Sequence, residues 1–160
     1  MAKLQKITPN LWFDTEAEEA ANFYTSIFKN SDVLRVMHYG EAGPRPAGMV
    51  MTVTFELEGQ QFTGLNGGPE FKFNEAVSLL VNCEGQEEVD ELWERLSEGG
   101  EEGPCGWLKD RYGLSWQIIP TVLDEMLQDE DADKANRVMK AMLQMGKIDI
   151  AALEEAYGPR

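Results

Sequence analysis

The chain has 160 residues, 42% of them hydrophobic, and a formal net charge of −15 from 29 acids against 14 bases. This length suits one domain or two small modules, and the apolar content excludes a disordered chain. The acidic balance argues against nucleic acid or an anionic lipid surface as a partner, because both carry negative charge.

Membrane insertion and secretion are not expected from this sequence. No apolar run approaches the ~18 residues of a membrane-spanning helix, and the first residues lack the apolar segment of a secretory signal. Cys83 and Cys105 show neither a metal-type spacing nor a disulfide framework. We therefore expect reduced thiols and a cytoplasmic location.

The first half of the chain predicts a β-α-β-β-β module. Residues 7–13 are typical of a strand, and a helix starts at Glu16 with one apolar stripe at helical spacing. Three further strands are expected, with a Gly/Pro loop between the first two and a hairpin turn at 58–60 before the last. The stripe is Ala20, Phe23, Tyr24 and Ile27, and the strands are Val33–Tyr39, Met49–Leu57 and Gln61–Asn66.

The second half repeats this pattern 69 residues later. Residues 76–83 again predict a strand, followed by a helical stripe that aligns with the first one without a gap. Glycines close this helix at 99–100, which leaves room before Pro120 for two good strands and at most a short third. The second module is thus the same unit, trimmed. Its stripe is Val89, Leu92, Trp93 and Leu96.

Beyond Pro120 the pattern becomes helical. Helices are expected at 121–129 and 134–145, and Asp149 can cap a last helix that runs to Tyr157. Four methionines in 126–145 fit either core packing or an adaptable lid or dimer contact. The predicted organisation is a paired-module domain at 1–120, with modules of about 1–70 and 71–120, and a helical extension at 121–160.

Residues 105–120 predict a cavity. Asp110–Gly113 forms a tight turn, and a half-buried strand follows. Asp110 is expected to accept backbone N–H groups in this turn, with a catalytic role as the alternative. Ser115 and Gln117 share one face of this strand, whereas Trp116 should pack under a helix. A polar amide in such a strand needs a partner or a ligand.

Several motifs together resemble the PhnB-like branch of the vicinal oxygen chelate (glyoxalase/dioxygenase) superfamily, the set named for a 3-demethylubiquinone-9 3-methyltransferase domain. The resemblance implies an α+β fold in which two modules curl a mixed sheet around a shared cavity. The motifs are Trp12-Phe13-Asp14, Asn22-Phe23-Tyr24, the run Gly64–Pro69, Cys105-Gly106-Trp107, Trp116-Gln117 and the tail 147–151.

The resemblance also locates the positions at which the superfamily's metalloenzymes bind their metal. These positions correspond to Pro9, Ser78, Gln117 and a residue near Leu65 or Asn66. Proline cannot bind a metal, and hydroxyls and neutral amides are poor ligands for transition metals. The sequence therefore predicts no metal and no other cofactor.

The methyltransferase name has no support in the glycine pattern. A site for S-adenosylmethionine in the common fold needs a strand, a glycine-rich turn and then a helix. The run Gly64–Pro69 leads instead from one predicted strand to another, which favours a hairpin.

The candidate binding residues are mostly uncharged. His38, the only histidine, is expected at the surface, although Glu41 could orient it as a base. Cys105 is either an inert core residue or a cavity thiol near Lys109 and Arg111. Trp107 is either core or a ligand platform. The proposed binding set is Asn66, Ser78, Asn82, Cys105, Trp107 and Gln117.

Two functions remain open on the sequence. Amides and hydroxyls around an apolar wall orient a small, partly apolar ligand but supply no acid, base or nucleophile. The first hypothesis is a small-molecule-binding protein, a homodimer, like the antibiotic-binding relatives in the superfamily. The alternative is an enzyme on a small organic substrate, including the methyl transfer in the family's name.

Overall fold

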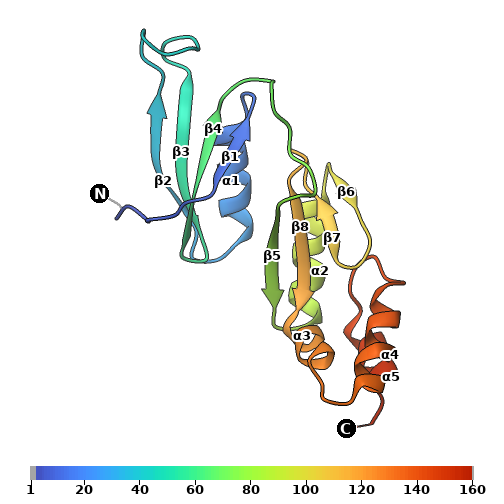
Figure 1. Ribbon diagram of the computed structural model, residues 1–160. Coiled ribbons are helices and arrows are strands. Elements are labelled where there is room, and N and C mark those ends of the chain that lie inside the picture. Colours follow the sequence, from blue (N-terminus) through green and yellow to red (C-terminus); the bar gives the residue numbers. More distant parts are fainter. Residues whose placement is uncertain (1–2, 160) are drawn as a thin grey trace. The chain divides into compact units, whose positions relative to one another are not determined.

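The computed structural model describes residues 3–159 and divides the chain into two compact units, Met1–Lys72 and Phe73–Arg160. Each unit contains its own four-stranded sheet (Figure 1). The expected α+β fold with two related modules is confirmed.

The first unit is the predicted β-α-β-β-β module. Its strand order is β1-β4-β3-β2, with β1 parallel to β4 and the other pairs antiparallel. The two-residue turn between β3 and β4 has Glu58 at φ 49° and Gly59 at φ 85°, the twist that suits a tight hairpin. The elements are β1 (Asn10–Phe13), α1 (Ala17–Ile27), β2 (Asp32–His38), β3 (Val50–Leu57) and β4 (Gln60–Asn66).

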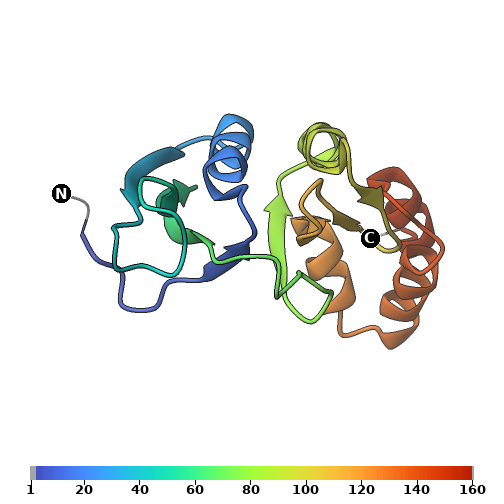
Figure 2. The same ribbon diagram turned by 90° about the horizontal axis from the view of Figure 1, so that it is seen from above.

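Helix α1 covers one face of this sheet, as Figure 2 shows from above. Ala20 and Tyr24 of the predicted stripe are fully buried, and they lie with Val53 and Phe55 of β3 in the core. Tyr24 and Phe55 have ring centroids 6.0 Å apart. The helical spacing in the sequence therefore identified the face of α1 that packs against the sheet.

The second unit repeats the same topology. Its strand order is β5-β8-β7-β6, again with the first pair parallel and the others antiparallel. Instead of two good strands after the helix, however, there are one good strand and two very short ones, because the turn at 103–106 and the turn at 110–114 consume the remaining chain. The elements are β5 (Ser78–Cys83), α2 (Gln86–Ser97), β6 (Glu101–Glu102), β7 (Trp107–Lys109) and β8 (Ser115–Pro120).

Three helices follow in the second unit and share a small core of their own. The expected cap at Asp149 is present, because its side chain accepts a hydrogen bond from the Ala152 N–H. The helices are α3 (Thr121–Leu127), α4 (Ala132–Met142) and α5 (Ile150–Tyr157). Their buried core consists of Leu123, Met126, Val138, Ile148, Leu153 and Tyr157.

The apolar side chains of the extension are divided between core and surface. Met126 is 2% exposed, as expected of a core residue, whereas Met139 and Leu143 on the outer side of α4 are 38% and 56% exposed. Core packing is therefore confirmed for Met126, and the lid or dimer contact stays a prediction.

One local prediction is wrong. The run Gly64–Pro69 does not form a hairpin, because β4 and the next strand, β5, belong to different sheets. The run instead ends β4 and begins the connection to the second unit. Sequence spacing alone could not show which strands pair.

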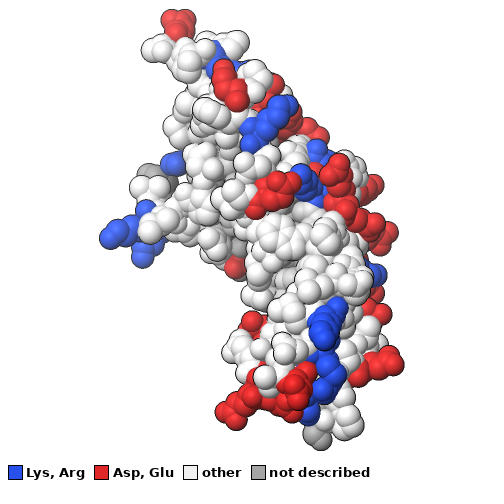
Figure 3. All heavy atoms as spheres, turned by 45° about the vertical axis from the view of Figure 1, so that its right-hand side comes forward, with Lys and Arg blue, Asp and Glu red and all other residues white. Residues whose placement is uncertain are grey.

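The surface carries charge in a dispersed pattern. Figure 3 shows acidic side chains spread over the face in view, with Lys and Arg between them and no single basic patch on that face. Within residues 3–159, no helix is long and apolar enough to cross a membrane.

Candidate functional site

The sheet of the second unit has one covered and one open face, and the strand register assigns side chains to each. Trp107, Gln117 and Leu80 are direct cross-strand neighbours. Lys109, Ser115 and Ser78 form the next row on the same face, because residues two apart in a strand point the same way. The side chains between them point to the opposite face, toward α2.

Trp116 anchors the covered face. It is 2% exposed, and its Nε1–H donates to Asp110 Oδ2 at 2.9 Å. Asp110 Oδ1 accepts the backbone N–H groups of Tyr112 and Leu114 at 2.9 and 3.1 Å. The expected turn role of Asp110 and the expected burial of Trp116 are both confirmed.

Gln117 lies on the open face and has a polar partner there. Its Nε2–H donates to Ser78 Oγ at 2.9 Å, and both side chains are half-buried. Leu80, its neighbour in the row, is 51% exposed, and Trp107 on the other side is half-buried. Gln117, oriented by its bond to Ser78 in the adjacent row, therefore lies between two apolar groups on a face that the unit itself leaves uncovered.

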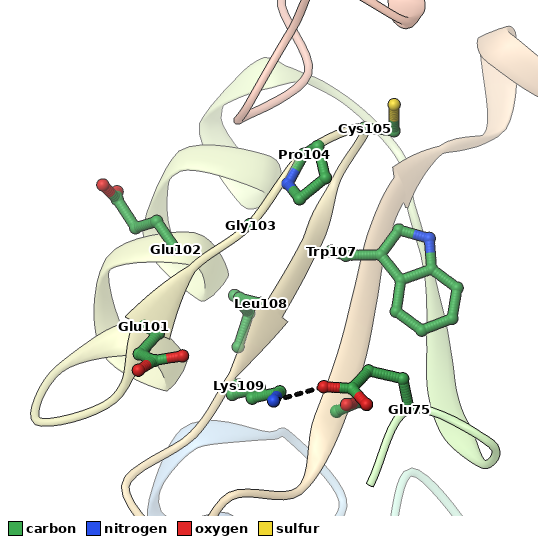
Figure 4. A pocket seen from close by; sticks show the side chains of 10 residues that line it. Glu75, Glu101, Glu102, Gly103, Pro104, Cys105, Trp107, Leu108 and Lys109 are labelled. Atoms are coloured by element: carbon green, nitrogen blue, oxygen red, sulfur yellow. Dashed lines mark ion pairs between the residues drawn. The ribbon is translucent and has the colours of Figure 1, made fainter.

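A pocket of about 580 Å³ opens beside this pair (Figure 4). In the figure the indole of Trp107 forms one side, Cys105 lies at the end near the β6–β7 loop, and Lys109 and Glu75 meet at the other end. The lining residues are Glu75, Glu101, Glu102, Gly103, Pro104, Cys105, Trp107, Leu108, Lys109 and Ser115.

Ser115 is the anomalous residue of the lining. It is 1% exposed, and its Oγ has no hydrogen-bond partner within the described chain. An unpaired buried hydroxyl costs free energy, about 1–3 kcal/mol in mutational data. Such a group at a pocket wall is suited to bind a ligand atom.

Lys109 and Glu75 form an ion pair across the same pocket. The hydrogen bond from Lys109 lowers the pKa of the Glu75 carboxyl, and the same bond raises the pKa of Lys109. Both groups therefore stay charged at neutral pH. Glu75 lies in the exposed segment that precedes β5, so its carboxylate is held mainly by this one partner.

The C-terminal helices hold the loop that carries Cys105. The N–H groups of Cys105 and Gly106 donate to the carbonyls of Met145 and Gly146, each at 2.8 Å. Cys105 has φ 56°, an unusual value for a residue other than glycine, and Gly106 has φ 82°. Backbone bonds from the extension thus stabilise a loop conformation that costs energy by itself.

A side chain of α2 fixes this part of the extension in turn. Gln86 Nε2–H donates to the Ile148 carbonyl at 3.0 Å, and Gln86 Oε1 accepts the Ile150 N–H at 2.7 Å. Lys147 pairs with Asp90 at 2.8 Å. The segment 145–150 therefore connects helix α2 to the pocket loop.

The predicted binding residues are only partly brought together. Cys105 and Trp107 line the pocket, and Ser78 and Gln117 lie beside it on the same face. Asn82 also belongs to this face but is exposed at the far end of β5. His38, which the sequence analysis considered as a possible base, is exposed at the end of the edge strand β2, where a surface residue was expected.

Asn66 has a structural role that the sequence did not reveal. It lies in the first unit, is 2% exposed, and its Oδ1 accepts the Ala17 N–H at 2.8 Å, which caps helix α1. Its Nδ2–H donates to the Val50 carbonyl at 3.1 Å. This bond supplies the cap that Glu16 at the N-cap position does not give, and the binding role of Asn66 stays a prediction.

Of the ten lining residues, the sequence proposed only Cys105 and Trp107 for binding. Glu75, Lys109 and Ser115 are among those that it missed. Ser115 was placed on the face of Gln117 by strand alternation, but its lack of a partner follows only from the three-dimensional packing. Lys109 was considered only as a neighbour of Cys105. No sequence signal connects it to Glu75, which lies more than thirty residues earlier.

The donor chemistry at the metal positions does not fit a metal. Ser78 Oγ already accepts the amide of Gln117, Asn66 caps a helix, and Pro9 offers only its carbonyl, which accepts the Thr63 N–H at 3.0 Å. Among residues 3–159 no three His, Cys, Asp or Glu side chains are grouped so that they could hold a metal ion.

The glycine run is not an open cradle for a nucleotide. A Cβ on Gly67 would meet the indole of Trp12 at 2.4–2.6 Å, and Trp12 Nε1–H donates to the Gly68 carbonyl at 2.8 Å. The glycines are therefore needed so that the chain can pass close to this tryptophan.

A family model described as 3-demethylubiquinone-9 3-methyltransferase matches residues 5–119. The chain belongs to this family. It is the PhnB-like branch of the vicinal oxygen chelate superfamily, so the resemblance inferred from the motifs is confirmed. The match ends where the helical extension begins.

Solved structures agree with this assignment. The PhnB protein from Bacillus cereus, described with the same methyltransferase name, is 40% identical, with 72% of this chain and 99% of that chain covered and a TM-score of 0.65. Protein PA1353 from Pseudomonas aeruginosa is 20% identical over 73% of this chain and 98% of its own, with a TM-score of 0.60.

A more distant structure shows the fold alone. The fosfomycin resistance protein FosX from Listeria monocytogenes is 17% identical over 78% of this chain and 98% of its own, with a TM-score of 0.51. A comparison with the curated proteins found no match. The PhnB-like family fold is thus established.

Proposed function

We propose that the protein binds a small, partly apolar organic molecule on the open face of the second sheet, without a metal ion. The observation that carries this proposal is Gln117, which lies between Leu80 and Trp107 and donates a hydrogen bond to Ser78 in the adjacent row, on a surface that the unit itself leaves uncovered. A few oriented polar groups on an apolar wall are typical of ligand sites.

The residues at this face favour recognition over catalysis. The amide and hydroxyl of Gln117 and Ser78 orient each other, so neither is a strong base or nucleophile. Cys105 lines the pocket, but none of the bonds described for its loop comes from a cationic side chain that would activate a thiol. Gln117, Ser78 and the apolar groups beside them are sufficient to bind a ligand without chemical turnover.

The family name favours a second candidate, methyl transfer to a small organic acceptor. This reaction needs S-adenosylmethionine or another methyl donor beside the acceptor, and the glycine run that could suggest a donor site is filled by Trp12. Saturable binding of S-adenosylmethionine by calorimetry would favour this enzyme over a binding protein.

A cytoplasmic homodimer is part of the proposal. The side chains of Val77 and Leu80 are 66% and 51% exposed at and beside the open face. A second copy of the chain or a bound ligand would remove this apolar area from water.

Native mass spectrometry of the purified protein tests the proposal directly. We expect a dimer mass and a retained small molecule that is released unchanged on denaturation. Gln117→Leu should lose this molecule. Gln128→Leu, the same change at the exposed residue that ends helix α3, should retain it. Equal retention by both variants would refute a site centred on Gln117.

A further inference from the structure

The donor groups of the open face are gathered in one row. Lys109, Ser115 and Ser78 are consecutive cross-strand neighbours on β7, β8 and β5. They offer an ammonium and two hydroxyls, all of which can donate hydrogen bonds. The adjacent row is Trp107, Gln117 and Leu80, which is apolar at both ends.

Two members of the donor row are open to a ligand, one because it has no partner and the other because its partner is exposed. Ser115 Oγ is buried at the pocket and makes no hydrogen bond to the described residues. Lys109 has a partner, but it is the carboxylate of Glu75 from the exposed segment before β5 (Figure 4). This carboxylate occupies the place at which a ligand anion would meet the ammonium.

The ion pair is of a kind that a ligand can displace. The side chain of Glu75 is 59% exposed and that of Lys109 is 37% exposed, and exposed pairs of this type are weak. A ligand carboxylate that also reached Ser115 would gain a bond that Glu75 leaves unmade.

The other acidic groups of the lining do not fill this role. Glu102 Oε1 accepts the indole N–H of Trp93 at 2.6 Å. Glu101 is the cross-strand neighbour of Lys109 at the exposed edge strand β6; its charge also raises the pKa of Lys109, but less than the bond to Glu75 does. Lys109 is thus the one ammonium in the pocket lining, and a ligand can take the place of its partner Glu75.

We propose that the ligand of this pocket is an amphipathic carboxylate, whose acid group displaces Glu75 from Lys109 and accepts a hydrogen bond from Ser115 while its apolar body lies against Trp107. This inference names the ligand class of the site proposed above and rests on that site. The carboxylate binds through the donor row, and the ring or chain binds through the apolar row.

Calorimetry with three matched probes tests the ligand class. The probes are 1-naphthoate, its neutral amide 1-naphthamide, and the cation 1-naphthylmethylamine. We expect the carboxylate to bind at least tenfold more tightly than the amide, and the amine to bind most weakly. Tightest binding of the amine, or equal binding of all three, overturns the proposal.

Three variants test the assigned groups. Lys109→Met should remove the preference for carboxylate over amide and leave the amide affinity unchanged. Glu75→Gln should raise the carboxylate affinity several-fold, because it removes a charged competitor. Ser115→Ala should lower the carboxylate affinity several-fold with thermal stability unchanged or higher, because the lost hydroxyl had no partner.

Lys134→Met is the matched control, since it removes another lysine charge of the same unit that lies outside the pocket lining and contacts only the far end of the extension. It should leave all three probe affinities unchanged. A carboxylate preference that survives Lys109→Met, or an affinity that falls in Glu75→Gln, contradicts the inference.

The outcomes also separate this inference from the proposed function. If naphthoate and naphthamide bind equally and Gln117→Leu weakens both, the site stands and the carboxylate class is wrong. If naphthoate is preferred through Lys109 but Gln117→Leu changes nothing, the anion subsite stands and the site centred on Gln117 is wrong.

Discussion

Replacing the neighbours Trp116 and Gln117 one at a time tests which face of β8 packs in the core and which face binds the ligand. Trp116 is 2% exposed and donates to Asp110, so Trp116→Ala leaves a void that costs about 3–5 kcal/mol. The carboxylate of Asp110, also 2% exposed, loses a donor, which adds about 1–3 kcal/mol. Such a loss is comparable to the whole stability of many domains.

Gln117→Leu should behave in the opposite way. The side chain is half-buried, the replacement has a similar volume, and a single bond to Ser78 is lost. The free energy of unfolding should change by no more than about 1–2 kcal/mol, while ligand retention falls. The fold persists and the binding is lost.

Urea unfolding followed by far-ultraviolet circular dichroism measures both effects. Trp116→Phe adds a control, because it keeps most of the ring volume and removes only the N–H bond to Asp110; its cost should be intermediate. A Trp116→Ala protein as stable as wild type beside a collapsed Gln117→Leu protein would show that the assignment of faces is inverted.

Two other predictions concern the pocket loop and the thiols. Gln86→Leu removes the two side-chain bonds from α2 to segment 145–150, so the amides of Cys105 and Gly106 should exchange with deuterium at least tenfold faster. Lys134→Met affects only the far end of the extension and should leave these exchange rates unchanged. Equal rates in the two variants would contradict a loop held by the extension. Burial, with the nearby charge of Glu88 as a lesser cause, raises the pKa of the Cys83 thiol to about 12, so at pH 8 an aromatic disulfide reagent should titrate one thiol per folded chain and none after Cys105→Ser. Two fast thiols in the folded protein would disprove this.

The elements of the fold could be predicted because they depend on local periodicity. The stripe of α1 and its repeat in α2 define a buried face whatever the rest of the chain does. Alternation along 115–120 likewise placed Trp116 and Gln117 on opposite faces without knowledge of their partners.

The remaining features depend on pairings between distant residues. Asn66 ends a strand, where a polar amide suits a ligand site and a helix cap equally well; only the fold brings it to Ala17, forty-nine residues away. The donor row of Lys109, Ser115 and Ser78 requires the register of three strands. No local pattern contains that register.

The measurement that tests the account most directly is an amide chemical-shift map from a ¹⁵N-labelled sample titrated with 1-naphthoate and, separately, with 1-naphthamide. The account predicts saturable shifts with at least one probe, concentrated in strands β5, β7 and β8 around Ser78, Trp107 and Gln117. Shifts confined to the first unit or to α4 and α5, or no saturable shifts with either probe, would contradict a small-molecule site on the open face of the second sheet.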